Sequence, residues 1–150
     1  MRFMMFMIPP EYQSSAPASK KAGENFAPPA EAVAAMMKYN EELAKGGVLI
    51  SLDGLHPMLK GARVAFRGGK TSVTDGPFVE AKEVVGGYWM IDVKSKEEAI
   101  DWAKRCPAVK VDSGAVIEVR QVFETSEFPD DVRKAADNSV VQAALDKHKR

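Results

Sequence analysis

The sequence of 150 residues has little of the chemistry on which several protein classes depend. Its single cysteine, Cys106, excludes an internal disulfide, so we expect a reducing compartment, the cytoplasm. Two histidines without ligand spacing do not suit a zinc site, and no metal or other cofactor is predicted. The 21 basic residues balance 21 acidic ones, giving zero net charge. We therefore expect no binding to nucleic acid.

Long apolar runs are also missing from the sequence. Residues 1–8 are apolar apart from Arg2, but Pro9 and Pro10 end the run. A secretory signal needs a longer apolar stretch with a small-residue cleavage site, and a membrane span needs about 20 apolar residues. We therefore interpret residues 1–8 as a buried strand and expect no membrane association.

Apolar periodicity and turn residues predict helices and strands in one domain. Residues 29–47 repeat apolar side chains at helical spacing and end at two glycines. A second helix is predicted from Ser95, which can form a capping box with Glu98, to Cys106 before Pro107. Four further segments are short and rich in β-branched or apolar residues, which predicts strands at 48–55, 62–69, 86–93 and 115–123.

This order of elements predicts an α+β fold with an antiparallel sheet and both helices on one face, the ferredoxin-like pattern of dimeric α+β barrels. The uncovered face needs a partner, so we predict a homodimer. Residues 1–124 form the domain, and 125–150 form a helical tail with a helix at 139–149. The Pro- and Ser-rich segment 9–29 is a long loop, either a lid over a site or an inert connection.

Several separated motifs carry a resemblance to a known family. The segment TDGPFVEAKEVVGG spans residues 74–87, with LDGLHP and KGARVAFRGGK before it, and SKEEAIDWAKRCP and IEVRQVFE after it. In this order they resemble the YCII-related (DGPF-domain) family, from residue 1 to about residue 124. The resemblance implies a ferredoxin-like fold, a homodimer whose sheets face each other, and a cleft beside the DGPF segment. It implies no particular reaction.

Asp75 and His56 are the candidate catalytic residues. Asp75 begins an Asp-Gly-Pro sequence that suits a tight turn, and its carboxylate can also act as a general base at the cleft. His56 is the only histidine outside the tail, and its imidazole can transfer protons near neutral pH. Some shorter YCII-like proteins have a histidine near the start of the first helix, with a suggested role in a dyad with aspartate. This chain has Glu31 at about that position, so the dyad does not carry over. We expect His56, Asp75 and Lys82 to converge on one cleft.

Three further residues are candidates for ligand binding. Glu80 and Lys82 lie in a charged run that is either a solvated face or, as the resemblance implies, part of the site beside Asp75. Lys82 would hold an anionic group of a ligand, and Glu80 would support it. Tyr88 alternates with Trp89 on a predicted strand, so one side chain belongs to the core and the other lines the cleft or the dimer contact.

Three roles are consistent with these observations, of which the third is a purely structural dimer. The first is a small enzyme without a cofactor, a lyase or isomerase in which Asp75 or His56 moves a proton on a small substrate. The second is a non-catalytic module that binds a small molecule or a regulatory partner. A pocket that contains Asp75 and His56 would favour the enzyme, whereas a flat apolar patch would favour the binding module.

Overall fold

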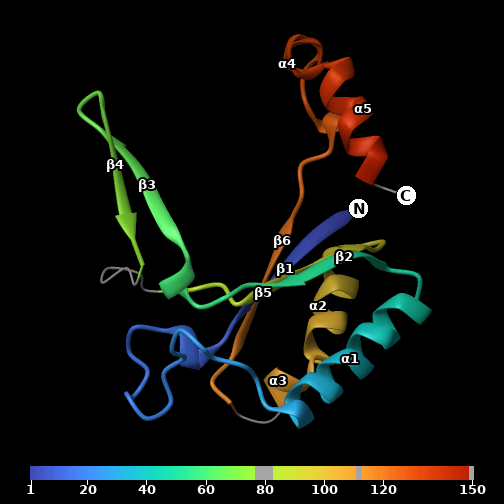
Figure 1. The fold of residues 1–150 in the computed structure, drawn as a ribbon. Helices are drawn as coiled ribbons and strands as arrows, with labels where there is room; N and C mark the ends of the chain where they lie inside the picture. Colours follow the sequence, from blue (N-terminus) through green and yellow to red (C-terminus); the bar gives the residue numbers. More distant parts are fainter. Residues whose placement is uncertain (77–82, 111–112, 149–150) are drawn as a thin grey trace.

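The computed structural model describes residues 1–76, 83–110 and 113–148, and its centre is a four-stranded antiparallel sheet. The strands of this sheet are β1 (Arg2–Ile8), β2 (Leu49–Gly54), β5 (Gly87–Asp92) and β6 (Val116–Gln121), in the order β2-β5-β1-β6. Helices α1 (Ala30–Lys45), α2 (Lys96–Lys104) and α3 (Pro107–Lys110) lie together on one side of it (Figure 1). The predicted α+β class with an antiparallel sheet is confirmed, and the strand order is compatible with a ferredoxin-like fold.

The core lies between this sheet and the helices. Side chains alternate across β1, so that Phe3, Met5 and Met7 are buried while Met4 and Phe6 are only partly covered. The buried side chains of β1 and β5 pack against the inner faces of α1 and α2. The cluster is formed by Phe3, Met5, Met7, Tyr39, Leu43, Val48, Trp89, Ile91, Val93, Ala99, Ala103 and Cys106.

The N-terminus of α2 has the cap that the sequence predicts, with one difference in its second bond. The Ser95 hydroxyl accepts a hydrogen bond from the Glu98 backbone N–H at 3.2 Å. The Glu98 carboxylate accepts a bond from the Lys94 backbone at 2.8 Å, whereas a capping box would use the Ser95 N–H. The bond to Ser95 satisfies an N–H group that the first turn leaves without a helical partner, and the bond to Glu98 fixes the residue before the cap.

A separate hairpin interrupts the sheet between β2 and β5. Its strands β3 (Ala62–Arg67) and β4 (Lys70–Asp75) meet at two glycines with φ near 57° and 73°, which suits a tight hairpin turn. Figure 1 shows that the hairpin projects away from the sheet and the helices. The sequence analysis did not predict β4, because this strand is exposed along its whole length and has no apolar run.

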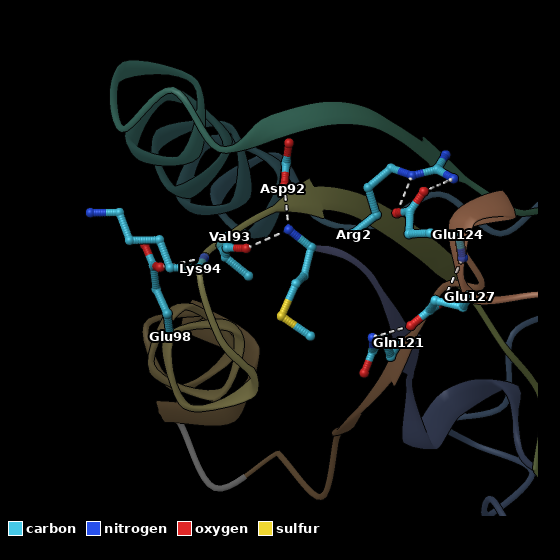
Figure 2. A network of polar contacts seen from close by, with 9 residues as sticks. Arg2, Asp92, Val93, Lys94, Glu98, Gln121, Glu124 and Glu127 are labelled. Atoms are coloured by element: carbon cyan, nitrogen blue, oxygen red, sulfur yellow. Dashed lines mark hydrogen bonds and ion pairs between the residues drawn. The ribbon is translucent and has the colours of Figure 1, made fainter.

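The segment after β6 contains a short 3₁₀ turn (Thr125–Glu127) and the tail helices α4 (Asp130–Ala136) and α5 (Ser139–His148). Figure 2 shows how its beginning is attached: the Arg2 guanidinium donates to both oxygens of Glu124, at 2.9 and 3.0 Å. This hydrogen-bonded pairing holds the pKa of Glu124 below its usual value. Among the helices that the structure describes, none is long and apolar enough to cross a membrane.

Candidate functional site

A cavity of about 450 Å³, here called the inner cavity, lies where β1 and β2 end and β5 and β6 begin. Its walls come from these strand ends, from α1, from the segment after α2, and from the loop between β1 and α1. Most of the lining is apolar, including Met7, Val33, Met36, Met37, Leu52 and Trp89. Its charged lining residues are the acids Glu11 and Asp53, and in the described part of the chain no basic side chain joins them.

Asn40 is a buried polar residue in this apolar lining, with 8% of its surface exposed. The Trp89 indole N–H donates a hydrogen bond to Asn40 Oδ1 at 2.8 Å. An indole nitrogen can only donate, so the amide oxygen must face Trp89 and the amide nitrogen must face the other way. That nitrogen lies 3.7 Å from Met37 Sδ, which also belongs to the cavity lining.

A second cavity of about 330 Å³, the outer cavity, continues from the first. The two share six lining residues: Met7, Pro9, Glu11, Pro28, Gly54 and Gly86. The rings of Tyr12 and Phe26 meet edge to face at 5.7 Å in its wall, and the Tyr12 hydroxyl donates to the Leu55 carbonyl at 2.8 Å. Burial raises the pKa of Tyr12 above its usual value.

The loop between β1 and α1 is held against these cavities by Gln13. Its amide nitrogen donates to the Val84 carbonyl at 3.1 Å, and its amide oxygen accepts the Val84 N–H at 2.8 Å. Two residues further on, Gly86 donates to the Met7 carbonyl at 2.8 Å and accepts from the Leu55 N–H at 2.9 Å. A Cβ at Gly86 would lie 2.6 Å from the ring of Pro9, so this close approach requires glycine.

Two of the predicted site residues belong to these cavities. His56 lines the outer cavity, with an exposed side chain. Tyr88 contributes to the inner cavity and donates its hydroxyl to Asp53 Oδ2 at 2.9 Å. This bond to a carboxylate raises the pKa of Tyr88.

The other predicted site residues are not brought together with them. Asp75, which the sequence analysis assigned to a turn, is the last residue of β4; it is exposed and lines neither cavity. Glu80 and Lys82 lie outside the described residues. The expected convergence of His56, Asp75 and Lys82 on one cleft therefore stays a prediction. Within the described residues, no cluster of His, Cys, Asp and Glu suits a metal ion.

Comparison with known proteins assigns the chain that forms these cavities to a family. The profile of the YCII-related domain matches residues 1–126. The chain belongs to the YCII-related family. It is also similar to an uncharacterized protein of Rhizobium meliloti (strain 1021), with 34% identity over 98 residues, which cover 64% of this chain and 75% of the relative. The resemblance inferred from the DGPF segment and its flanking motifs is thus confirmed.

Sequence reasoning missed three residues that shape the cavities of this YCII-related protein. Asn40 stands in the apolar stripe of α1, and a polar residue at such a position was the available signal. Gln13 and Gly86 had no comparable signal, because their roles depend on contacts between segments about 70 residues apart. The paired glycines at 86 and 87 indicated a turn but not its closeness to Pro9.

Proposed function

We propose that this YCII-related protein binds a small, neutral and mainly apolar molecule in the inner cavity. The observation that carries the proposal is an apolar cavity of about 450 Å³ with a few polar groups in its wall. Ligand sites typically enclose about 300–1,000 Å³ and place a small number of polar groups among apolar side chains. Asn40 is such a group here; Asp53 and Tyr88 also border the cavity, but their hydrogen-bonded side chains lie on the face of the sheet opposite the helices.

The charges of the lining support a neutral ligand. Glu11 and Asp53 would repel an anionic ligand, and in the described residues no basic side chain offsets them. The predicted role of Lys82, which lies outside the described residues, stays a prediction.

A thermal-shift screen of a small-molecule library tests this proposal. A ligand present at 100 times its Kd stabilises the folded state by about 2.7 kcal/mol, which corresponds to roughly 5–10 °C in a chain of this size. We expect neutral apolar compounds to give such shifts and to bind with one-to-one stoichiometry in native mass spectrometry. Hits restricted to anions, or no hits among neutral compounds, would contradict the proposal.

Proton transfer by His56 is a second candidate function, of the lyase or isomerase type. It is favoured by the position of His56 in the outer cavity, which shares six lining residues with the inner one. An imidazole there can act as acid or base on a molecule that extends from the inner cavity. Asp75 keeps its proposed catalytic role only if it approaches the cleft.

For this second function, His56→Gln should lower turnover of a substrate about 100-fold or more and leave its Kd unchanged. Glutamine keeps a polar side chain of similar reach but cannot exchange a proton near neutral pH. Turnover and binding would be measured on the same compound, found by the thermal-shift screen. Unchanged turnover in the variant would exclude His56 as the acid or base.

We also propose that the protein is a homodimer whose sheets face each other as in dimeric α+β barrels. The face of the sheet opposite the helices carries Met4, Phe6, Tyr88 and Met90, all partly exposed. Both charge signs occur beside them, with Glu118 and Arg120 3.7 Å apart on β6, so two copies can face each other without repulsion. Such an interface should bury on the order of 1,000 Å² or more.

A further inference from the structure

The orientation of the Asn40 amide indicates what kind of group the inner cavity receives. Its oxygen is occupied by the Trp89 indole, which fixes its nitrogen on the side of Met37. Both Met37 and Asn40 line the cavity. The buried amide therefore presents hydrogen-bond donors, and not an acceptor, to this part of the wall.

The protein partner of these donors is a weak one. An asparagine amide nitrogen carries two N–H groups, while the thioether sulfur of Met37, at 3.7 Å, is a poor acceptor. A buried N–H that lacks a good acceptor is unfavourable in an apolar surrounding. A ligand oxygen at this position would offer an acceptor that the thioether cannot match.

We propose that the ligand of the inner cavity carries an uncharged acceptor oxygen, a ketone or amide carbonyl on an apolar body, which accepts a hydrogen bond from Asn40 Nδ2. This inference rests on the function proposed above and names its ligand class. The acidic residues Glu11 and Asp53 disfavour a carboxylate as that acceptor. The remaining lining, which includes Val33, Met36 and Leu52, would enclose the apolar body.

A matched pair of compounds tests the inference on the wild-type protein. The ketone 2-acetylnaphthalene and the alkene 2-isopropenylnaphthalene have nearly the same shape, but only the ketone has an acceptor oxygen. We expect the ketone to bind about 5- to 10-fold more tightly, as the gain of one buried hydrogen bond implies. Calorimetry would give both Kd values, and the NMR signal of the Trp89 indole N–H would report occupation beside Asn40.

The variant Asn40→Asp adds an independent measurement. It keeps an oxygen for the Trp89 indole but replaces the amide donors with a second oxygen. The Kd of the alkene divided by the Kd of the ketone should therefore fall to about one or below. Asn25→Asp makes the same change at an exposed loop position outside both cavities and should keep the preference. Retention of the wild-type preference in a folded Asn40→Asp protein would overturn the assignment of Asn40.

The outcomes separate this inference from the proposed function. Equal binding of the two compounds to the wild-type protein would overturn the acceptor inference and leave the apolar ligand site standing. Binding of neither compound, together with no hit among neutral compounds in the thermal-shift screen, would overturn both. The wild-type comparison decides even where Asn40→Asp fails to fold.

Discussion

Replacing Ala32 with tryptophan is expected to weaken ligand binding in the inner cavity at least 100-fold, or about 2.7 kcal/mol. Ala32 is the third residue of α1; it is exposed and lines the cavity. Side chains of a helix lean towards its N-terminus, so the indole should extend towards Pro28, another lining residue. There it would occupy the space that the ligand requires.

Ala34→Trp is the matched control for this prediction. Ala34 lies two residues further along the same helix, is also exposed, and lines neither cavity. Both variants receive the same large side chain on α1, so general effects on helix stability should be shared. We expect Ala34→Trp to bind as the wild type does in calorimetry. Undiminished binding by Ala32→Trp would place the ligand outside the inner cavity.

The central sheet could be predicted because its strands carry strong local signals. In β1 and β5 buried side chains alternate with less covered ones, and all four strands are short segments rich in apolar or β-branched residues, as in residues 86–93. The first helix could be predicted in the same way, from its apolar stripe and from the glycines at its end. β4 was missed because both faces of the hairpin are exposed, and no burial pattern marks Thr71 and Val73 as strand residues.

The site could be predicted only in part. His56 and Tyr88 were identified from residue type and from their places at a turn and on a strand, and both line a cavity. The cavity itself forms from contacts distant in sequence, such as those between Gln13 and Val84. No local pattern encodes such a contact. Asp75 illustrates the converse, because a conspicuous motif residue lies at the end of an exposed hairpin and outside both cavities.

Phe6→Glu is expected to convert a wild-type dimer into a monomer. In the sheet Phe6 pairs with Tyr88 on one side and Glu118 on the other, at the centre of the face that lies opposite the helices. A carboxylate there would lose its hydration on dimerisation and lie beside Glu118, a cost of several kcal/mol. The dimer Kd should rise about 1,000-fold, measured by sedimentation velocity. The monomer should stay folded, because Phe6 is only partly covered within one chain.

Phe66→Glu makes the same substitution on the hairpin instead of the sheet. Comparing the two variants shows which of these surfaces forms the interface. Phe66 is 77% exposed on β3, next to Val64 and Val73 on the hairpin, which carries an apolar surface of its own. If the sheets face each other, Phe66→Glu should leave the dimer intact while Phe6→Glu dissociates it. Dissociation by Phe66→Glu alone would mean that the copies meet through their hairpins. A wild-type monomer at micromolar concentration would contradict the homodimer, and the apolar sheet face would then need a cover other than a second copy.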